Sequence, residues 1–142
     1  LQSLDHRGAI AADCTGDCAG LLTQIPRKLI QRELRAHGAS VDPEGLGLIM
    51  CFLPPADAAV SRTIVTDALE AEGLRLIMWR SVPIDPSVLG EHAREVLPLI
   101  EQAVVTGEPA DLERSLYLAR KRMERNANPG MSIPSASSRS RC

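Results

Sequence analysis

Short continuous runs of apolar residues alternate along this chain with stretches in which apolar residues recur every three or four positions. Continuous runs of this length, bounded by Pro or Gly, are typical of buried strands. They lie at residues 20–25, 46–53, 74–82 and 99–105. The run at 46–53, LGLIMCFL, is apolar at nearly every position, which favours a central strand covered on both faces.

The stretches with helical spacing lie at residues 27–37, 56–72, 88–94 and from about 111 to 125. The second is the clearest, because its apolar residues fall on one helical face. Gly38 and Gly73 follow the first two stretches, at the position after a helix that favours glycine. The resulting order is strand, helix, strand, helix, strand, strand, helix, with the short stretch at 88–94 as a further helix candidate. This order fits α/β and α+β folds equally well.

The composition changes at Asn126, where Asn-Ala-Asn-Pro-Gly ends the last helical stretch. Residues 132–142, SIPSASSRSRC, are rich in Ser and Arg and offer little to bury, which predicts disorder. The predicted organisation is therefore one domain over residues 1–125 and a disordered tail over 126–142.

Composition narrows the class of protein. The chain has 142 residues, enough for one domain with a core. Its net charge is −2 and Phe, Trp and Tyr occur once each, so neither nucleic acid nor an anionic membrane is expected as a partner. No apolar run approaches the roughly 20 residues that span a bilayer. The four cysteines are scattered and the first residues do not resemble a signal peptide, which predicts free thiols in a reducing cytoplasm.

Charged and thiol side chains that could form a functional site are concentrated near the start of the sequence. They lie in Leu-Asp-His-Arg-Gly-Ala at residues 4–9 and in Ala-Asp-Cys-Thr-Gly-Asp-Cys-Ala-Gly at residues 12–20. Arg7 is permanently charged and presents planar donors that suit a carboxylate or an oxyanion. Gly8 beside it allows a sharp turn or close approach to a ligand. Pairing of Arg7 with a nearby aspartate, which would stabilise the loop, is an equal alternative.

Three of the four cysteines are candidates for metal ligands or nucleophiles. Cys14 and Cys18 are spaced C-x3-C with no second Cys/His pair, so no metal site is expected. His6 and Arg7 could hold a thiolate at either cysteine, but two unpaired loop thiols are the commoner case. Cys51 lies in an apolar run and is assigned to the core.

Two other features have ordinary interpretations. The segment TGDCAG at residues 15–20 is not a Walker loop, because no Lys-Ser/Thr follows and the next element is predicted to be a strand. In Trp-Arg-Ser-Val-Pro at residues 79–83, Trp79 is expected to pack inward and Arg80 to lie on the surface.

Six segments taken together resemble a known family: LQSLDHRGAIAAD, TGDCAGLLTQIP, MCFLP, GLRLIMWRSVPID, LGEHAR with PLIEQAVV, and DLERSLYLARKRMER. In this order they resemble the N-terminal class II glutamine amidotransferase domain of the large subunit of glutamate synthase. The motifs HRGA, TGD-x-AG and WR-x-VP are specific as a set. The resemblance covers Leu1 to about Arg125, and the tail is not part of it.

The resemblance implies an α+β fold, a partial N-terminal-nucleophile hydrolase sandwich of two antiparallel sheets between helix layers. It implies that an N-terminal cysteine attacks the amide of glutamine and releases ammonia, which combines with 2-oxoglutarate to make glutamate in nitrogen assimilation. The expected partners are glutamine, the remaining synthase domains and the small subunit. FMN and an iron–sulfur cluster are expected in the rest of the parent enzyme, and no cofactor or metal is expected in this chain.

Only Arg7 is carried over as a catalytic residue, because it occupies the place of the active-site arginine in the family's HRG motif. The nucleophile is expected upstream of Leu1 and the Asn-Gly oxyanion pair beyond Arg125, so the chain is expected to be inactive alone. Cys18 stands where the family usually has Gly, and the loop around Cys14 is one residue shorter. The alternatives are a non-catalytic binding or scaffold module and a truncated gene product.

Overall fold

The computed structural model describes residues 9–10, 16–17, 23–127 and 130–137. The chain divides into two compact units. The first comprises Leu1–Thr23 and Pro83–Leu97, and the second comprises Gln24–Val82 and Pro98–Cys142.

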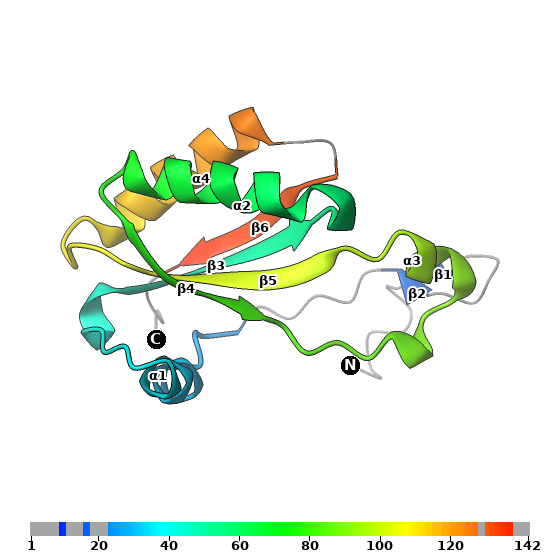
Figure 1. The fold of residues 1–142 in the computed structure, drawn as a ribbon, viewed down its shortest axis with the longest axis horizontal. Helices are drawn as coiled ribbons and strands as arrows, with labels where there is room; N and C mark the ends of the chain where they lie inside the picture. The colour runs from blue at the N-terminus through cyan, green and yellow to red at the C-terminus, as the bar shows by residue number, and fades with distance from the viewer. Residues whose placement is uncertain (1–8, 11–15, 18–22, 128–129, 138–142) are drawn as a thin grey trace. The chain divides into compact units, whose positions relative to one another are not determined.

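The second unit is built on a four-stranded sheet in the order β4-β5-β3-β6, in which all neighbouring strands are antiparallel (Figure 1). The strands are β3 (Leu46–Leu53), β4 (Arg75–Ser81), β5 (Leu99–Thr106) and β6 (Ser132–Ser137). β3 and β5 pair along their full length, from Leu46 opposite Thr106 to Leu53 opposite Leu99. An antiparallel sheet with separate helices decides between the two fold classes in favour of α+β.

Helices cover both faces of this sheet. α2 (Ala58–Glu70) and α4 (Leu112–Asn126) lie on one face and α1 (Arg27–Ala36) on the other (Figure 1). Short 3-10 turns at Pro43–Gly45 and Pro55–Asp57 precede β3 and α2.

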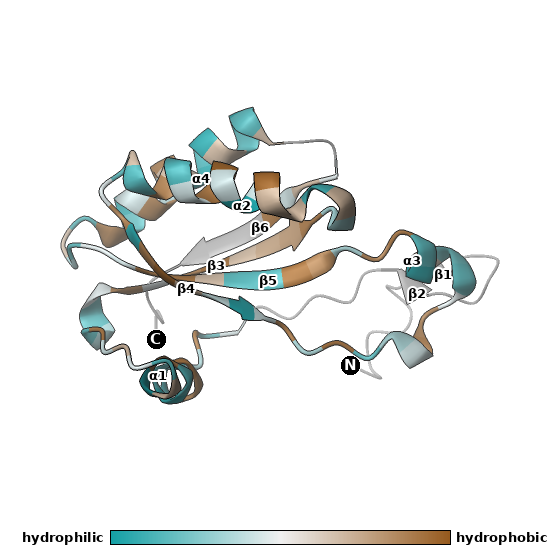
Figure 2. Cartoon of the chain, in the orientation of Figure 1, coloured by the Kyte–Doolittle hydropathy of each residue, from teal (hydrophilic) through white to brown (hydrophobic). Residues whose placement is uncertain are grey.

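The side chains of β3 point alternately to the two faces of the sheet, and so contribute to a hydrophobic cluster on each face. Ile49, Cys51 and Leu53 belong to the cluster shared with α2 and α4, while Leu46 belongs to the cluster shared with Ile30 of α1. Successive strand residues point to opposite faces, so a strand covered on both sides must be apolar at successive positions. This accounts for the run LGLIMCFL and for the hydrophobic colouring of β3 in Figure 2.

α1 and α2 end at glycines, as the sequence predicts. Gly38 and Gly73 have φ of 70° and 72°, a left-handed conformation that costs glycine little. The amide of Leu74 then donates to the carbonyl of Leu69 at 2.9 Å, and the amide of Ala39 donates to that of Leu34 at 2.9 Å. These bonds satisfy carbonyls that have no partner within the helix.

The first unit contains a two-stranded antiparallel sheet of β1 (Ala9–Ile10) and β2 (Gly16–Asp17). It also contains a 3-10 turn at Pro86–Val88 and the short helix α3 (Glu91–Glu95). The carboxylate of Asp85 accepts hydrogen bonds from the hydroxyl and amide of Ser87 at 2.6 and 3.0 Å, which lowers the pKa of Asp85.

Most predicted elements are confirmed to within two or three residues, which is close to the ordinary uncertainty of element ends. The strand predicted at residues 20–25 is wrong for residues 23–25, which are irregular. There the amide of Arg27 donates to the carbonyl of Ile25 at 2.8 Å, so the chain is already turning into α1. Residues 20–22 lie outside the described part.

The disorder predicted for the tail is wrong at Ser132–Ser137, which forms β6. This strand pairs with β3, and the side chain of Ile133 is 6% exposed within the core under α4. The tail therefore does bury apolar surface. Residues 138–142 and 128–129 lie outside the described part.

Gly47 of β3 lies where a side chain would collide with the core. A Cβ there would lie 2.8 Å from Cγ2 of Val105 and 3.2 Å from Cδ1 of Leu116. We expect Gly47→Ala to lower the free energy of unfolding by about 1–3 kcal/mol, because a packed core resists an added methyl group. Urea denaturation measures this change.

The control makes the same substitution in a Val105→Ala variant, which lacks the Cγ2 atom nearest to the added methyl group. Gly47→Ala should cost clearly less in that background, because the two sites are coupled. An equal cost in both backgrounds would contradict overpacking as the cause.

Candidate functional site

The two motifs that dominate the sequence prediction meet in the first unit. Ala9 of HRGA lies opposite Asp17 of TGD, and Ile10 lies opposite Gly16. The antiparallel pairing of β1 and β2 thus brings the last residue of HRGA beside the last residue of TGD. His6, Arg7, Cys14 and Cys18 themselves lie outside the described residues, so the catalytic role of Arg7 stays a prediction.

The WR-x-VP motif lies on β4 and presents its two large residues to opposite faces of the sheet. A register shift between Leu76 and Met78 interrupts the alternation, so Ile77 and Met78 both belong to the α1 side. Trp79 then packs against the core under α2 and α4, as predicted. Such bulges re-aim side chains along a strand.

Arg80 is mostly buried, so the prediction of a surface arginine is wrong. Its side chain is 14% exposed, and its Nε donates to the carboxylate of Glu33 on α1. Its Nη1 donates to Oε1 of Gln102 on β5 at 2.9 Å. The reason is that α1 covers this face and brings a carboxylate over the strand.

A second arginine–carboxylate pair lies on the other face. Arg62 of α2 donates through Nε and Nη2 to the two carboxylate oxygens of Glu101 on β5, at 2.8 and 2.6 Å. Glu101 is 8% exposed at its side chain and Arg62 is 38% exposed. The hydrogen bond to Glu101 raises the pKa of Arg62, and its guanidinium carbon lies 6.0 Å from the ring centroid of Trp79.

These two pairs hold helices on the sheet. Each carboxylate accepts charge-assisted hydrogen bonds from an arginine, which are stronger and more directional than bonds between neutral groups. Sequence reasoning missed both pairs, because the partners lie 39 and 47 positions apart. The one local signal was the polar pair Glu101-Gln102 inside the otherwise apolar run LIEQAVV.

Cys51 is a core residue, as predicted. It is 0% exposed, and burial, together with the charge of Glu101, raises the pKa of its thiol to about 12. A thiol of that pKa is almost wholly protonated at neutral pH and is a poor nucleophile. The hydroxyl of Ser61 on α2 is likewise buried, and it has no hydrogen-bond partner among the residues that the structure describes.

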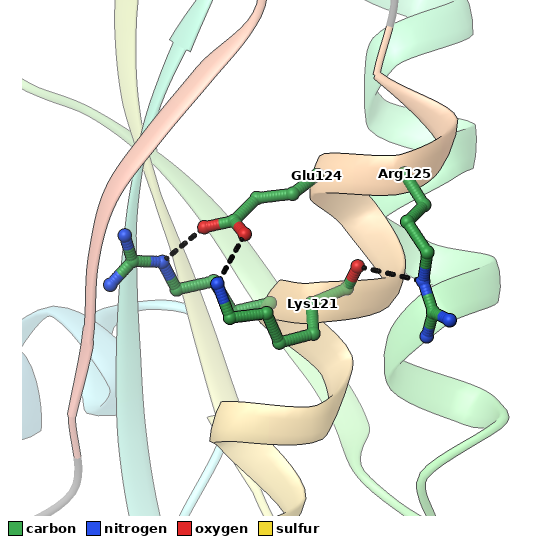
Figure 3. A network of polar contacts seen from close by, with 4 residues as sticks. Lys121, Glu124 and Arg125 are labelled. Atoms are coloured by element: carbon green, nitrogen blue, oxygen red, sulfur yellow. Dashed lines mark hydrogen bonds and ion pairs between the residues drawn. The ribbon is translucent and has the colours of Figure 1, made fainter.

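A pocket of about 220 Å³ lies where α4 gives way to β6. Figure 3 shows the polar side chains near it: Nε of Arg120 and Nζ of Lys121 donate to the carboxylate of Glu124 at 2.9 and 2.7 Å. Arg125 donates to the carbonyl of Lys121 at 3.2 Å. The bond from Lys121 is the main cause that lowers the pKa of Glu124.

The described residues contain neither a metal-binding cluster nor a membrane-spanning helix. Residues 23–127, with the short described segments on either side, contain no cluster of three or more His, Cys, Asp or Glu that could hold a metal ion. No helix in the part of the chain that the structure describes is both long and apolar enough to cross a membrane.

The chain has an α+β fold in which an antiparallel sheet lies between helices, and Ala9 of HRGA pairs with Asp17 of TGD. Residues 1–140 match the family described as Glutamine amidotransferases class-II. The chain therefore belongs to the class II glutamine amidotransferases. The match extends beyond residue 125, the predicted end of the domain. A domain boundary at residue 125 stays a prediction.

The curated relatives are glutamate synthases. The chain is 37% identical over 133 residues to ferredoxin-dependent glutamate synthase 2, chloroplastic, of Arabidopsis thaliana, covering 88% of this chain and 8% of that protein. It is 38% identical over 128 residues to ferredoxin-dependent glutamate synthase 2 of Synechocystis sp., covering 84% and 8%. It is 34% identical over 133 residues to the glutamate synthase [NADPH] large chain of Azospirillum brasilense, covering 88% and 9%. The chain thus spans less than a tenth of the length of these relatives.

The pair of Arg62 and Glu101 predicts a stability change. Arg62→Met leaves a carboxylate that is 8% exposed without its cation, so we expect a loss of about 1–3 kcal/mol in the free energy of unfolding. The double variant Arg62→Met/Glu101→Leu should recover most of this loss, because no buried charge remains. Urea denaturation of the three proteins measures both effects, and a single variant within about 0.5 kcal/mol of the parent would contradict the role of the pair.

The buried thiol of Cys51 predicts protection from alkylation. With iodoacetamide at pH 8, Cys51 should stay unmodified in the folded chain, because only about one part in 10⁴ of a thiol of pKa 12 is ionised. Peptide mass spectrometry locates the label, and the same reaction in urea, where Cys51 should react, is the control. Rapid labelling of Cys51 in the folded chain would show that it is accessible.

Proposed function

We propose that this chain is a segment of the glutaminase domain of a glutamate synthase, the part that binds glutamine for the release of ammonia. The observation that carries the proposal is the family match over residues 1–140, together with the three glutamate synthases that the chain resembles at 34–38% identity. Ammonia from this domain would combine with 2-oxoglutarate in the remaining synthase domains. Those domains and the small subunit are the proposed partners.

The proposed fold is a partial N-terminal-nucleophile hydrolase sandwich. The antiparallel sheet of β4, β5, β3 and β6, with α2 and α4 on one face, is consistent with one sheet and one helix layer of that sandwich. The FMN and the iron–sulfur cluster are proposed to belong to synthase regions outside these 142 residues.

Arg7 is the proposed catalytic residue. A guanidinium group is charged at all physiological pH values and binds a carboxylate or an oxyanion through parallel hydrogen bonds. Arg7 comes two positions before β1, whose pairing with β2 limits how the HRGA and TGD segments can be arranged. Its proposed role is to bind the carboxylate of glutamine or the oxyanion formed as the amide is attacked.

These 142 residues are proposed to be inactive by themselves. None of the four cysteines corresponds to the expected nucleophile, and Cys51 is protonated and buried. Without a nucleophile there is no covalent route for Arg7 to assist. What remains testable in this chain is the binding of glutamine.

We expect saturable binding of glutamine to the chain, weakened about tenfold or more by Arg7→Ala, because a charged hydrogen bond to the ligand is lost. Isothermal titration calorimetry measures the affinity, and a coupled assay measures ammonia, which should not exceed background. Arg32→Ala, on the exposed side of α1, is the control that removes the same charge elsewhere.

Two outcomes would overturn the proposal in different ways. Absence of glutamine binding in a chain that circular dichroism shows to be folded would favour a non-catalytic scaffold module. Ammonia release that depends on Arg7 would refute the proposed inactivity.

A further inference from the structure

The outer faces of α2 and α4 carry opposite charge. On α2, one exposed line of residues ends in carboxylates; we call Val60, Thr63, Asp67 and Glu70 the acidic stripe. On α4, the corresponding exposed line is Arg114, Tyr117, Lys121 and Arg125, which we call the basic stripe. Both lines follow the spacing of three and four residues that keeps side chains on one face of a helix.

Several of these charges are not neutralised within the chain. Among the described residues, Asp67, Glu70 and Arg114 form no hydrogen bond or ion pair through their side chains. Arg125 donates to a backbone carbonyl and so keeps its full charge. In contrast, Arg122 of α4 does reach Glu72 beyond the end of α2, at 2.5 Å. Arg122 and Glu72 thus pair between the two helical regions, whereas the residues of the two stripes are exposed on the surface.

The same face exposes two apolar side chains. Val60 of the acidic stripe is 53% exposed and Tyr117 of the basic stripe is 59% exposed. Tyr117 is one of three aromatic residues in the chain, and Nζ of Lys121 lies 5.9 Å from its ring centroid. Tyrosine and arginine are enriched at protein interfaces relative to the rest of the surface.

We propose that two copies of this chain associate through this face, with the acidic stripe of each copy against the basic stripe of the other. The start of α4 lies beside the end of α2, because Leu112 and Leu74 both approach Gly107, so the two helices run in opposite directions (Figure 1). A two-fold axis parallel to the helices and between them places each α2 over the partner's α4. Arg114 then faces Asp67 and Glu70 of the other copy, and a single surface serves both copies.

The charges and the size of this face favour a second copy of the chain as its partner over a nucleic acid or a membrane. A nucleic-acid backbone laid on this face would meet the carboxylates of α2, which repel phosphate. A membrane surface would find only Val60 and Tyr117 to bury. α4 has 15 residues and is thus about 22 Å long, so two helices offer an interface smaller than that of a typical stable complex. The dimer is therefore weak and sensitive to salt.

The test is sedimentation velocity of the whole chain at rising concentration. We expect a dimer in low salt that dissociates at least tenfold more readily in 0.5 M salt, a condition about three times the physiological ionic strength. Arg114→Glu and Glu70→Arg should each weaken self-association at least tenfold, since each places like charges across the axis. Mixed in equal amounts, the two variants should form a heterodimer, because both contacts then regain opposite charges.

Arg32→Glu on α1, which makes the same charge change on the opposite face of the sheet, should leave association unchanged. Circular dichroism establishes that each variant is folded. A parent chain that stays monomeric to about 100 µM in low salt, or two variants that do not associate with each other, would overturn the proposal. The measurement involves no glutamine, so its result is independent of the proposed function.

Discussion

The pairing of β3 with β5 is the interaction on which the rest of the second unit depends. These strands form the centre of the sheet, and both of their faces are buried, one under α2 and α4 and the other under α1. Each helix has an apolar face and needs the sheet to cover it, since isolated helices of this length are marginal in water. Loss of this ladder would remove the surface on which both helix layers pack.

Two arginine–carboxylate pairs fix the helices that this apolar packing leaves free to slide. Hydrophobic contact is non-directional, whereas the bidentate bonds from Arg62 to Glu101 define one position of α2 on β5. Arg80 does the same for α1 through Glu33 and Gln102. Burying such charges is costly, so these pairs contribute more to a unique arrangement than to net stability.

The sequence predicts the elements of this fold well and their partners poorly. The strands and helices follow from periodicity and from glycines such as Gly38 and Gly73, which are local signals. β6 was missed because the burial of Ile133 depends on β3 and α4, which lie beside it only in the folded chain. The position of Arg80 was missed for the same reason, since Glu33 lies 47 residues away. The role of Arg7 rests on its charge and on a family resemblance, and it stays a prediction because Arg7 lies outside the described residues.

The three motifs that carried that resemblance therefore differ in their structural roles. WR-x-VP is architectural in this chain, because Trp79 fills one core and Arg80 anchors the helix on the opposite face. Ala9 of HRGA pairs with Asp17 of TGD between β1 and β2. Both motifs carry charged residues, which do not contribute to a hydrophobic core. Similarity to an enzyme family can thus reflect the scaffold as much as the site. In the second unit the side chains of WR-x-VP contribute to packing and to holding α1 on the sheet, so that part of the resemblance is accounted for by the fold alone.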